Sequence, residues 1–293
     1  MKNVYDWLDA GNTLVGDGAM GTALQAAGLD DGGAPELWNV THPDRVAAVL
    51  TSYAEAGAQF LTTNSFGGTK PRLAMHDLQE RVHELNKAAS LVAREVADKN
   101  GGLFVFGDVG PSGELLEPIG AMSIDEATEI FAEQIRGLVD GGADAILVET
   151  MSDLNEVRAA VNAAHSVAPD IPVAVTLSFD TNLRTMMGVK PSTAIKEIAE
   201  MGVRLIGANC GRGTDEMRII GQELVDAKPE GVHVLLTSNA GLPQLVGGDF
   251  VYTGTPEVMA EFVDDMKAIG VKAFGACCGS RPEHIAAIAA ALG

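Results

Sequence analysis

The sequence is poor in basic residues. It contains 20 Lys and Arg against 40 Asp and Glu, which leaves a formal net charge of −20. Proteins that bind nucleic acids or anionic membranes through general electrostatics need a basic surface. We therefore expect no nucleic-acid partner and no membrane partner.

Long hydrophobic runs and linkers are also missing. No run reaches the roughly 18 apolar residues of a transmembrane helix, and residues 1–18 lack the apolar centre of a secretory signal. No stretch rich in Pro, Ser or Gly separates two parts of the chain. We expect a cytoplasmic protein whose residues 1–293 form a single domain.

Cysteines and aromatic residues are few. The three cysteines are an odd number and two of them are adjacent, which argues against a disulfide framework. Aromatic residues make up 5% of the chain, with two Trp and three Tyr. A quaternary ammonium ligand usually needs a cage of aromatic faces, so this composition disfavours such a ligand.

Eight short apolar runs recur along the chain, with turn residues at their ends. None alternates cleanly between apolar and polar residues, a pattern typical of parallel strands that are buried on both faces. The expected strands fall at 13–18, 59–66, 103–110, 145–150, 173–179, 204–211, 232–241 and 272–279.

Amphipathic segments with helix signals separate these runs. A glycine before a strand recurs four times and predicts a left-handed helix C-cap, at Gly57, Gly142, Gly202 and Gly270. Ser123 and Ser280, each followed three residues later by Glu, predict capping boxes, and Thr255 before Pro256 predicts an N-cap. Residues 3–10 indicate an additional helix before the first strand.

Eight β-α units predict an α/β fold, the (β/α)8 TIM barrel. A doubly wound open sheet is the alternative, because Gly16, Gly18 and Gly21 fit the G-x-G-x-x-G spacing. No acidic residue closes a second strand about 20 residues later, as a dinucleotide site requires. The barrel is the favoured interpretation.

Polar residues close most of the expected strands. In a barrel these positions share the catalytic face at the carboxyl ends of the strands. They are Asp17, Asn64, Asp108, Glu149, Asn209, Cys210, Asn239, Cys277 and Cys278.

All three cysteines belong to this set. Cys210 ends the sixth run, and Cys277 and Cys278 end the eighth, so their sulfurs can converge over the barrel mouth. Three thiolates suit Zn²⁺ and leave a fourth corner open, as in catalytic zinc sites. The alternative is that these cysteines are small core residues.

Six strand ends together resemble the homocysteine S-methyltransferase family. This family includes the homocysteine-binding module of cobalamin-dependent methionine synthase and betaine–homocysteine methyltransferase. The resemblance rests on GDGAMGT (16–22), TNSFGGT (63–69), VET (148–150), GANCG (207–211), SNAGLPQ (238–244) and GACCGSRPEHI (275–285).

The resemblance implies a zinc-dependent transfer of a methyl group to homocysteine, giving methionine. Cys210, Cys277 and Cys278 match the zinc ligands, and the homocysteine thiolate takes the fourth position and attacks the donor methyl. No catalytic residue is expected beyond this zinc site.

The resemblance also implies residues for the rest of homocysteine. Asp17, Gly18 and Glu149 match positions that hold the amino acid part, with Glu149 expected at the ammonium and the Gly18 turn at the carboxylate. Asn239 is expected as a weak zinc ligand when substrate is absent. The alternatives are helix capping by Asp17 and Glu149 and a turn hydrogen bond by Asn239.

The methyl donor favoured by the sequence is methylcobalamin on a separate corrinoid-binding protein. Gly67 and Thr150 stand where betaine-type members have tyrosines, and Trp38 is the aromatic that matches. Betaine or a sulfonium donor such as S-methylmethionine is the alternative. Two other classes stay open: a non-catalytic subunit that binds a corrinoid protein, and an aldolase- or phosphate-handling barrel, for which Arg281 is the one candidate phosphate contact.

Overall fold

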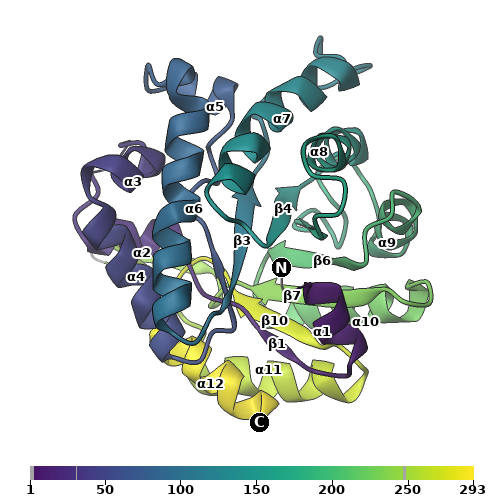
Figure 1. Ribbon diagram of the computed structural model, residues 1–293. Helices are drawn as coiled ribbons and strands as arrows, with labels where there is room; N and C mark the ends of the chain where they lie inside the picture. The colour runs from purple at the N-terminus through teal and green to yellow at the C-terminus, as the bar shows by residue number, and fades with distance from the viewer. Residues whose placement is uncertain (1–2, 31, 247–248) are drawn as a thin grey trace.

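Eight parallel strands form a nearly closed barrel, with helices around its outside (Figure 1). The computed structural model describes residues 3–30, 32–246 and 249–293. Each of the eight expected runs overlaps one barrel strand. The strands are β1 (Leu14–Val15), β2 (Phe60–Thr62), β3 (Phe104–Val109), β4 (Ala145–Met151), β5 (Val173–Leu177), β6 (Leu205–Cys210), β7 (His233–Ser238) and β10 (Ala273–Ala276).

The strand order confirms the barrel and shows that the doubly wound alternative is wrong. Neighbouring strands follow the order β1-β10-β7-β6-β5-β4-β3-β2, which is chain order around a ring. The helices that connect and flank them are α1 (Val4–Asp9), α2 (Met20–Ala26), α3 (Trp38–Thr41), α4 (Pro43–Glu55), α5 (Lys70–Ala74), α6 (Val82–Lys99), α7 (Ile124–Asp140), α8 (Leu154–Val167), α9 (Pro191–Glu200), α10 (Thr214–Ala227), α11 (Pro256–Ala268) and α12 (Pro282–Leu292).

Most of the expected helix ends are confirmed. All four glycines of the helix–Gly–strand pattern have positive φ, between 89° and 104°. Ser123 and Glu126 form both hydrogen bonds of a capping box, and the Thr255 side chain caps α11.

The predicted capping box at Ser280 is wrong. α12 begins at Pro282 with Arg281 as its N-cap residue. His284 takes the capping role, since its Nδ1 accepts from the Arg281 N–H at 3.0 Å and its Nε2 donates to the Gly254 carbonyl at 2.9 Å. Ser280 is buried and its Oγ accepts from the Ala19 N–H at 3.0 Å. Tertiary contacts therefore decide this helix start.

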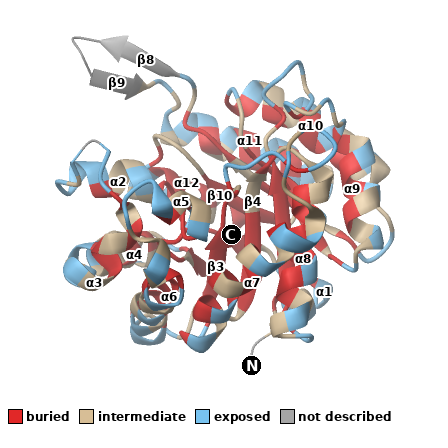
Figure 2. Ribbon diagram, turned by 90° about the horizontal axis from the view of Figure 1, so that it is seen from above, coloured by how far each residue is buried: buried red, intermediate tan, exposed pale blue. Residues whose placement is uncertain are grey.

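Apolar side chains fill the part of the barrel interior that lies away from the carboxyl ends of the strands. Phe60 and Phe106 stack at 4.3 Å between ring centroids, and leucines from several strands pack around them. Val4 and Leu8 of α1 join the same cluster, so the expected N-terminal helix closes the end of the barrel opposite the carboxyl ends. Figure 2 shows this division, with buried strands at the centre and exposed residues on the outer faces of the helices.

The barrel closes between β1 and β2 through a short seam. The Gln59 N–H donates to the Val15 carbonyl at 2.7 Å, and the Gln59 side chain accepts from the Val15 N–H at 2.9 Å. Gly16 lies against the Phe60 ring across the seam, where a Cβ would have no room. β1 is only two residues long, and the Gln59 side chain therefore supplies part of the hydrogen bonding that closes the barrel.

An antiparallel hairpin, β8 (Pro243–Val246) and β9 (Asp249–Tyr252), follows β7. The sequence analysis missed it, although Gly247-Gly248 between two short apolar runs is a hairpin signal. Within the described ranges, none of the helices combines the length and hydropathy that crossing a bilayer requires.

The glycine caps generate a stability prediction. At Gly202 φ is 89° and a Cβ would meet nothing within 4 Å, so Gly202→Ala is expected to cost only the left-handed backbone penalty, roughly 1 kcal/mol. At Gly57 φ is 104° and a Cβ would lie 2.9 Å from the Ala289 Cβ, so Gly57→Ala is expected to cost more. Urea unfolding of both variants measures the difference; equal losses would contradict this account.

Candidate functional site

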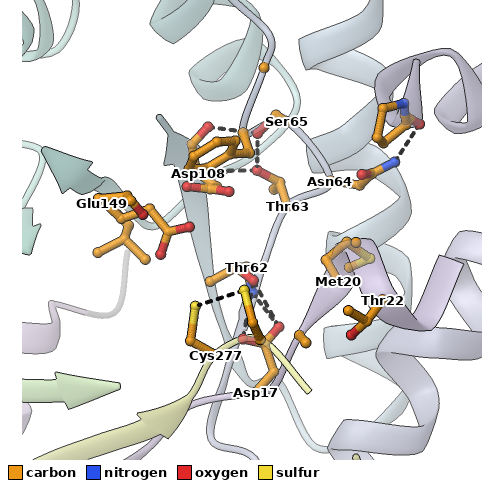
Figure 3. A pocket seen from close by; sticks show the side chains of 18 of the residues that line it. Asp17, Met20, Thr22, Thr62, Thr63, Asn64, Ser65, Asp108, Glu149 and Cys277 are labelled. Carbon is orange, nitrogen blue, oxygen red and sulfur yellow. Dashed lines mark hydrogen bonds between the residues drawn. The ribbon is translucent and has the colours of Figure 1, made fainter. Parts of the chain in front are cut away.

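Polar side chains form a ring at the carboxyl ends of the strands, and a cavity of about 540 Å³ opens above them. Alternate residues on each strand point into the barrel. The apolar interior layers therefore end in a polar floor that includes Thr62, Asp108, Glu149 and Thr237. Figure 3 shows Asp17, Thr62 and Cys277 together on one side of this pocket, with Asp108 and Glu149 near each other on the opposite side.

The three cysteines meet at this rim, as the sequence predicted. Their sulfurs all lie within 4.8 Å of one another, with 2.9 Å between Cys210 and Cys277 and 4.0 Å between Cys277 and Cys278. Ligands bound to zinc at about 2.3 Å in a tetrahedron stand about 3.8 Å apart. The donor set therefore fits a zinc ion after a small separation of Cys210 from Cys277.

The thiols hydrogen-bond to one another, so each sulfur influences the ionisation of the others. Hydrogen bonds from Cys210 and Cys277 lower the pKa of Cys278 to about 3. Hydrogen bonds to Cys210 and Cys278, followed by burial, hold the pKa of Cys277 well above its ordinary range. The pKa of Cys210 is raised as well, so the three side chains share one thiolate, on Cys278, and a metal cation would have to displace the protons of the other two thiols.

Asn239 follows β7 and is hydrogen-bonded to the backbone at Cys210 and Gly211, but it is not among the residues that line the pocket. Its N–H donates to the Cys210 carbonyl at 3.4 Å, and its Nδ2 donates to the Gly211 carbonyl at 2.8 Å, so the turn hydrogen bond considered as an alternative is present. Its Oδ1 is buried and accepts no hydrogen bond from any described residue. A buried oxygen without a partner is costly, and this one has a lone pair to offer a metal.

Asp17 holds the seam between β1 and β2. Its carboxylate accepts from the Thr62 N–H at 2.7 Å and from the Thr62 hydroxyl at 3.0 Å. Burial raises the pKa of Asp17 to about 7, despite these hydrogen bonds. The capping alternative does not describe it, because neither hydrogen bond reaches α2.

Gly18 begins the turn beside Asp17 and lines the pocket. A Cβ here would lie 2.7 Å from the Ser280 Oγ and 2.8 Å from the Tyr53 ring, so glycine is needed for close packing. Ser280 accepts from the Ala19 N–H and the Tyr53 hydroxyl donates to the Ala19 carbonyl. The turn is therefore held rigidly at the pocket wall.

Glu149 points into the pocket from the end of β4. Burial in the pocket wall raises its pKa to about 8, and the charge of Asp17 adds to the shift. Its alternative role as a helix cap is excluded, because Asp153 caps α8.

Two strained residues flank the site. Thr150 and Cys210 have φ of 61° and 58°, a conformation that non-glycine residues rarely adopt. Asn209 joins them: its Oδ1 accepts from the Thr150 N–H at 2.9 Å and its Nδ2 donates to the Thr150 hydroxyl at 2.7 Å. Such strain is concentrated at functional sites and is maintained by surrounding contacts.

Aromatic side chains contribute little to the pocket. Those that line it in the described part of the chain are Phe60 and Phe66. Trp38, the aromatic singled out from the sequence, is buried in α3 between His42 and Arg45 and does not line the pocket. An aromatic cage for a quaternary ammonium group is thus not formed by these residues.

Two features of the site were not predicted. Thr62 positions Asp17, yet nothing in the sequence pairs residues 45 positions apart. Tyr252, at the end of β9, places its ring against Gly279, close enough for the charges of all three cysteines to act on its hydroxyl. The sequence signal that could have indicated this contact is Gly279, because the absence of a side chain there leaves room for the Tyr252 ring.

Comparisons with known proteins agree with this arrangement. The methionine synthase of Mycobacterium tuberculosis is 36% identical over 310 aligned positions, and that of Mycobacterium leprae is 35% identical over 298. These alignments cover 99% and 97% of this chain but only 26% and 24% of the relatives, so the chain spans about a quarter of their length.

Among solved structures, the metallated form of the homocysteine methyltransferase MmuM from Escherichia coli superposes with a TM-score of 0.80. The two chains are 23% identical, and the match covers 97% of this chain and 98% of MmuM. At this identity the likeness shows a shared fold.

The family assignment comes from the sequence as a whole. The profile of the homocysteine S-methyltransferase family matches residues 14–292, from the first barrel strand to the last helix. The chain belongs to the homocysteine S-methyltransferase family.

Proposed function

We propose that residues 1–293 act as a homocysteine-binding domain that transfers a methyl group to the thiol of homocysteine and forms methionine. The observation that carries this proposal is the convergence of three free thiols within 4.8 Å at the edge of a pocket lined by acidic side chains. Thiols that must remain reduced fit a cytoplasmic location.

Cys210, Cys277 and Cys278 would hold a zinc ion. When bound there, zinc would lower the pKa of a substrate thiol at its open position and so make that thiol a nucleophile at neutral pH. Asn239, whose buried Oδ1 has no hydrogen-bond partner among the described residues, would be a weak ligand at that position when substrate is absent.

The chain's own residues bind the amino acid part of homocysteine. Glu149, with its carboxylate facing the pocket, binds the ammonium group. The Ala19 N–H already donates to Ser280, so the other backbone N–H groups of the turn at Gly18 bind the carboxylate, as oriented backbone amides do in anion sites. Asp17 forms the adjoining wall. Together these groups aim the thiol at the cysteine cluster.

The proposed donor is a methylcorrinoid carried by a separate protein that docks over the barrel mouth. Two observations support it: the relatives named methionine synthase, and the small number of aromatic side chains at the site, which among the described residues are Phe60 and Phe66 in the pocket lining and Tyr252 beside Gly279. The homocysteine sulfur forms a bond to the methyl carbon while the bond from that carbon to the donor breaks, and the electron pair leaves with the donor.

Zinc content tests the metal site. We expect about one zinc per chain in protein purified without chelator and near-complete loss in Cys210→Ala, because two thiolates bind zinc far more weakly than three. Elemental analysis measures the metal, and circular dichroism verifies that the variant is folded. Wild-type protein that cannot be loaded with zinc would sink the proposal.

Homocysteine kinetics test Glu149. Glu149→Gln keeps the shape of the side chain but removes the charge, so we expect KM for homocysteine to rise about tenfold or more while zinc content stays unchanged. An unchanged KM would show that the ammonium binds elsewhere.

The raised pKa values predict a pH dependence of stability. The folded state favours neutral Asp17 and Glu149, with pKa values of about 7 and 8. Their contribution to stability is fully present below their unfolded values near 4 and is lost as pH rises through 7 and 8. The lowered pKa of Cys278 acts in the opposite sense but is common to wild type and Glu149→Gln. We therefore expect the free energy of unfolding of metal-free wild type to fall relative to that of Glu149→Gln between pH 5 and 8. Identical pH profiles for the two proteins in urea unfolding would contradict this.

A further inference from the structure

The carboxyl end of β4 departs from regular pairing with β5. Val148 and Met151 of β4 pair with residues of β5 that stand only two positions apart, and the register shifts between these pairs. The intervening Glu149 and Thr150 therefore face a single residue of β5, which is the count of a β-bulge. Bulges beside active sites redirect side chains, and both residues of this bulge line the pocket.

The partner of this bulge comes from β6. The Thr150 N–H donates to the Asn209 Oδ1 at 2.9 Å, and the Thr150 hydroxyl accepts from the Asn209 Nδ2 at 2.7 Å. In the barrel β5 lies between β4 and β6. The Asn209 side chain therefore spans the width of one strand and gives the bulge the hydrogen bonds that a regular strand end would receive from its neighbour.

The same amide reaches the cysteine cluster. The Asn209 Nδ2 also donates to the Cys210 sulfur at 3.4 Å. An NH2 group has two N–H donors, so its bonds to Thr150 and Cys210 use both. The Thr150 N–H can only donate, so it fixes which end of the amide is the oxygen and leaves the NH2 group facing the sulfur.

Asn209 thus connects the two strained positions of the site. Thr150 and Cys210 both have positive φ, and strain of this kind persists only where surrounding contacts maintain it. Asn209 is fully buried and hydrogen-bonds to both residues. An ordinary core amide would need only to satisfy its own polar atoms. This one also sets the conformation and the surroundings of a cysteine that faces the pocket.

We propose that Asn209 is a positioning residue for the metal site. It holds the bulge of β4 against the end of β6, keeps the Cys210 sulfur directed toward the other two thiols, and donates a hydrogen bond to that sulfur in its thiolate form. Groups that hydrogen-bond to metal ligands fix the orientation of those ligands and tune the electron density on them. This inference rests on the proposed function, since it takes Cys210 as a metal ligand.

Metal affinity and the spectrum of cobalt-loaded protein test this assignment. In competition with a coloured chelator, Asn209→Ala is expected to lose roughly 10–100-fold of its zinc affinity. Cobalt(II) in place of zinc adds a thiolate-to-metal charge-transfer band. Loss of the N–H donor raises the energy of the sulfur electrons, so this band is expected at longer wavelength in Asn209→Ala. A smaller folded fraction would weaken the band without moving it.

A matched control separates positioning from general stability. Asn86 of α6 is also a fully buried amide, and its Nδ2 donates to the Gly68 and Val82 carbonyls. Asn86→Ala is expected to unfold at lower urea concentration but to keep the zinc affinity and the cobalt band of wild type. Asn209→Asp serves if Asn209→Ala does not fold. Its carboxylate can accept from the Thr150 N–H and hydroxyl but cannot donate to the sulfur, so the band is again expected at longer wavelength.

The outcomes distinguish this inference from the proposed function. If wild type binds zinc and cobalt, and the Asn209 variants keep its affinity and band position, the role of Asn209 is wrong and the proposed function stands. If Asn209→Ala and Asn86→Ala lose affinity equally and neither band moves, Asn209 is a structural residue only and the inference is again wrong. If wild type binds neither metal, the proposed function fails and this inference fails with it.

Discussion

The site depends on the closure of the barrel at the seam between β1 and β2. Parallel strands bring their carboxyl ends to one edge, but only a closed ring places the first, sixth and last strands around a single cavity. Here β1 has two residues, and Gln59 and Asp17 supply side-chain acceptors where a longer strand would supply carbonyls. Asp17, which helps to close the barrel, therefore also forms part of the pocket wall.

A second constraint is the excess of buried acid. Thiols and carboxyl groups meet in one cavity, and the basic residues at its border face Glu36 rather than the floor. This imbalance costs stability in the empty protein. It is the arrangement expected if the site binds cations, and the two ligands proposed above, a metal ion and an ammonium group, both are. Burial raises the pKa of both Glu149 and Asp108, and a cation bound beside them would favour their charged forms.

Much of this was readable from the sequence. Parallel strands that are buried on both faces appear in the sequence as short apolar runs, so the barrel was predictable. A left-handed helix C-cap favours glycine, so the four repeated helix ends were predictable too. The cysteines were predictable as a cluster because strand ends share one face. Contacts between distant segments were not predictable. The sequence around Ser280 matches a capping box, but the Ser280 hydroxyl accepts a hydrogen bond from the Ala19 N–H, and His284 caps the helix instead. The hydrogen bond from Thr62 to Asp17 likewise forms only when the barrel closes, and the lack of a hydrogen-bond partner for the Asp108 Oδ1 among the described residues can be seen only in the folded structure.

The pairing of β1 with β10 has a consequence for the order of assembly. Leu14 of β1 pairs with Ala273 of β10, so β1 can form this pairing only after a strand about 260 positions later in the chain has been synthesised. During synthesis the ring stays open until β10 emerges, and Cys277 and Cys278 follow β10 directly. Cys210 alone is a poor metal ligand. The growing chain therefore gains its complete set of thiols when the last barrel strand pairs with the first, so the proposed metal site would form only once the barrel has closed.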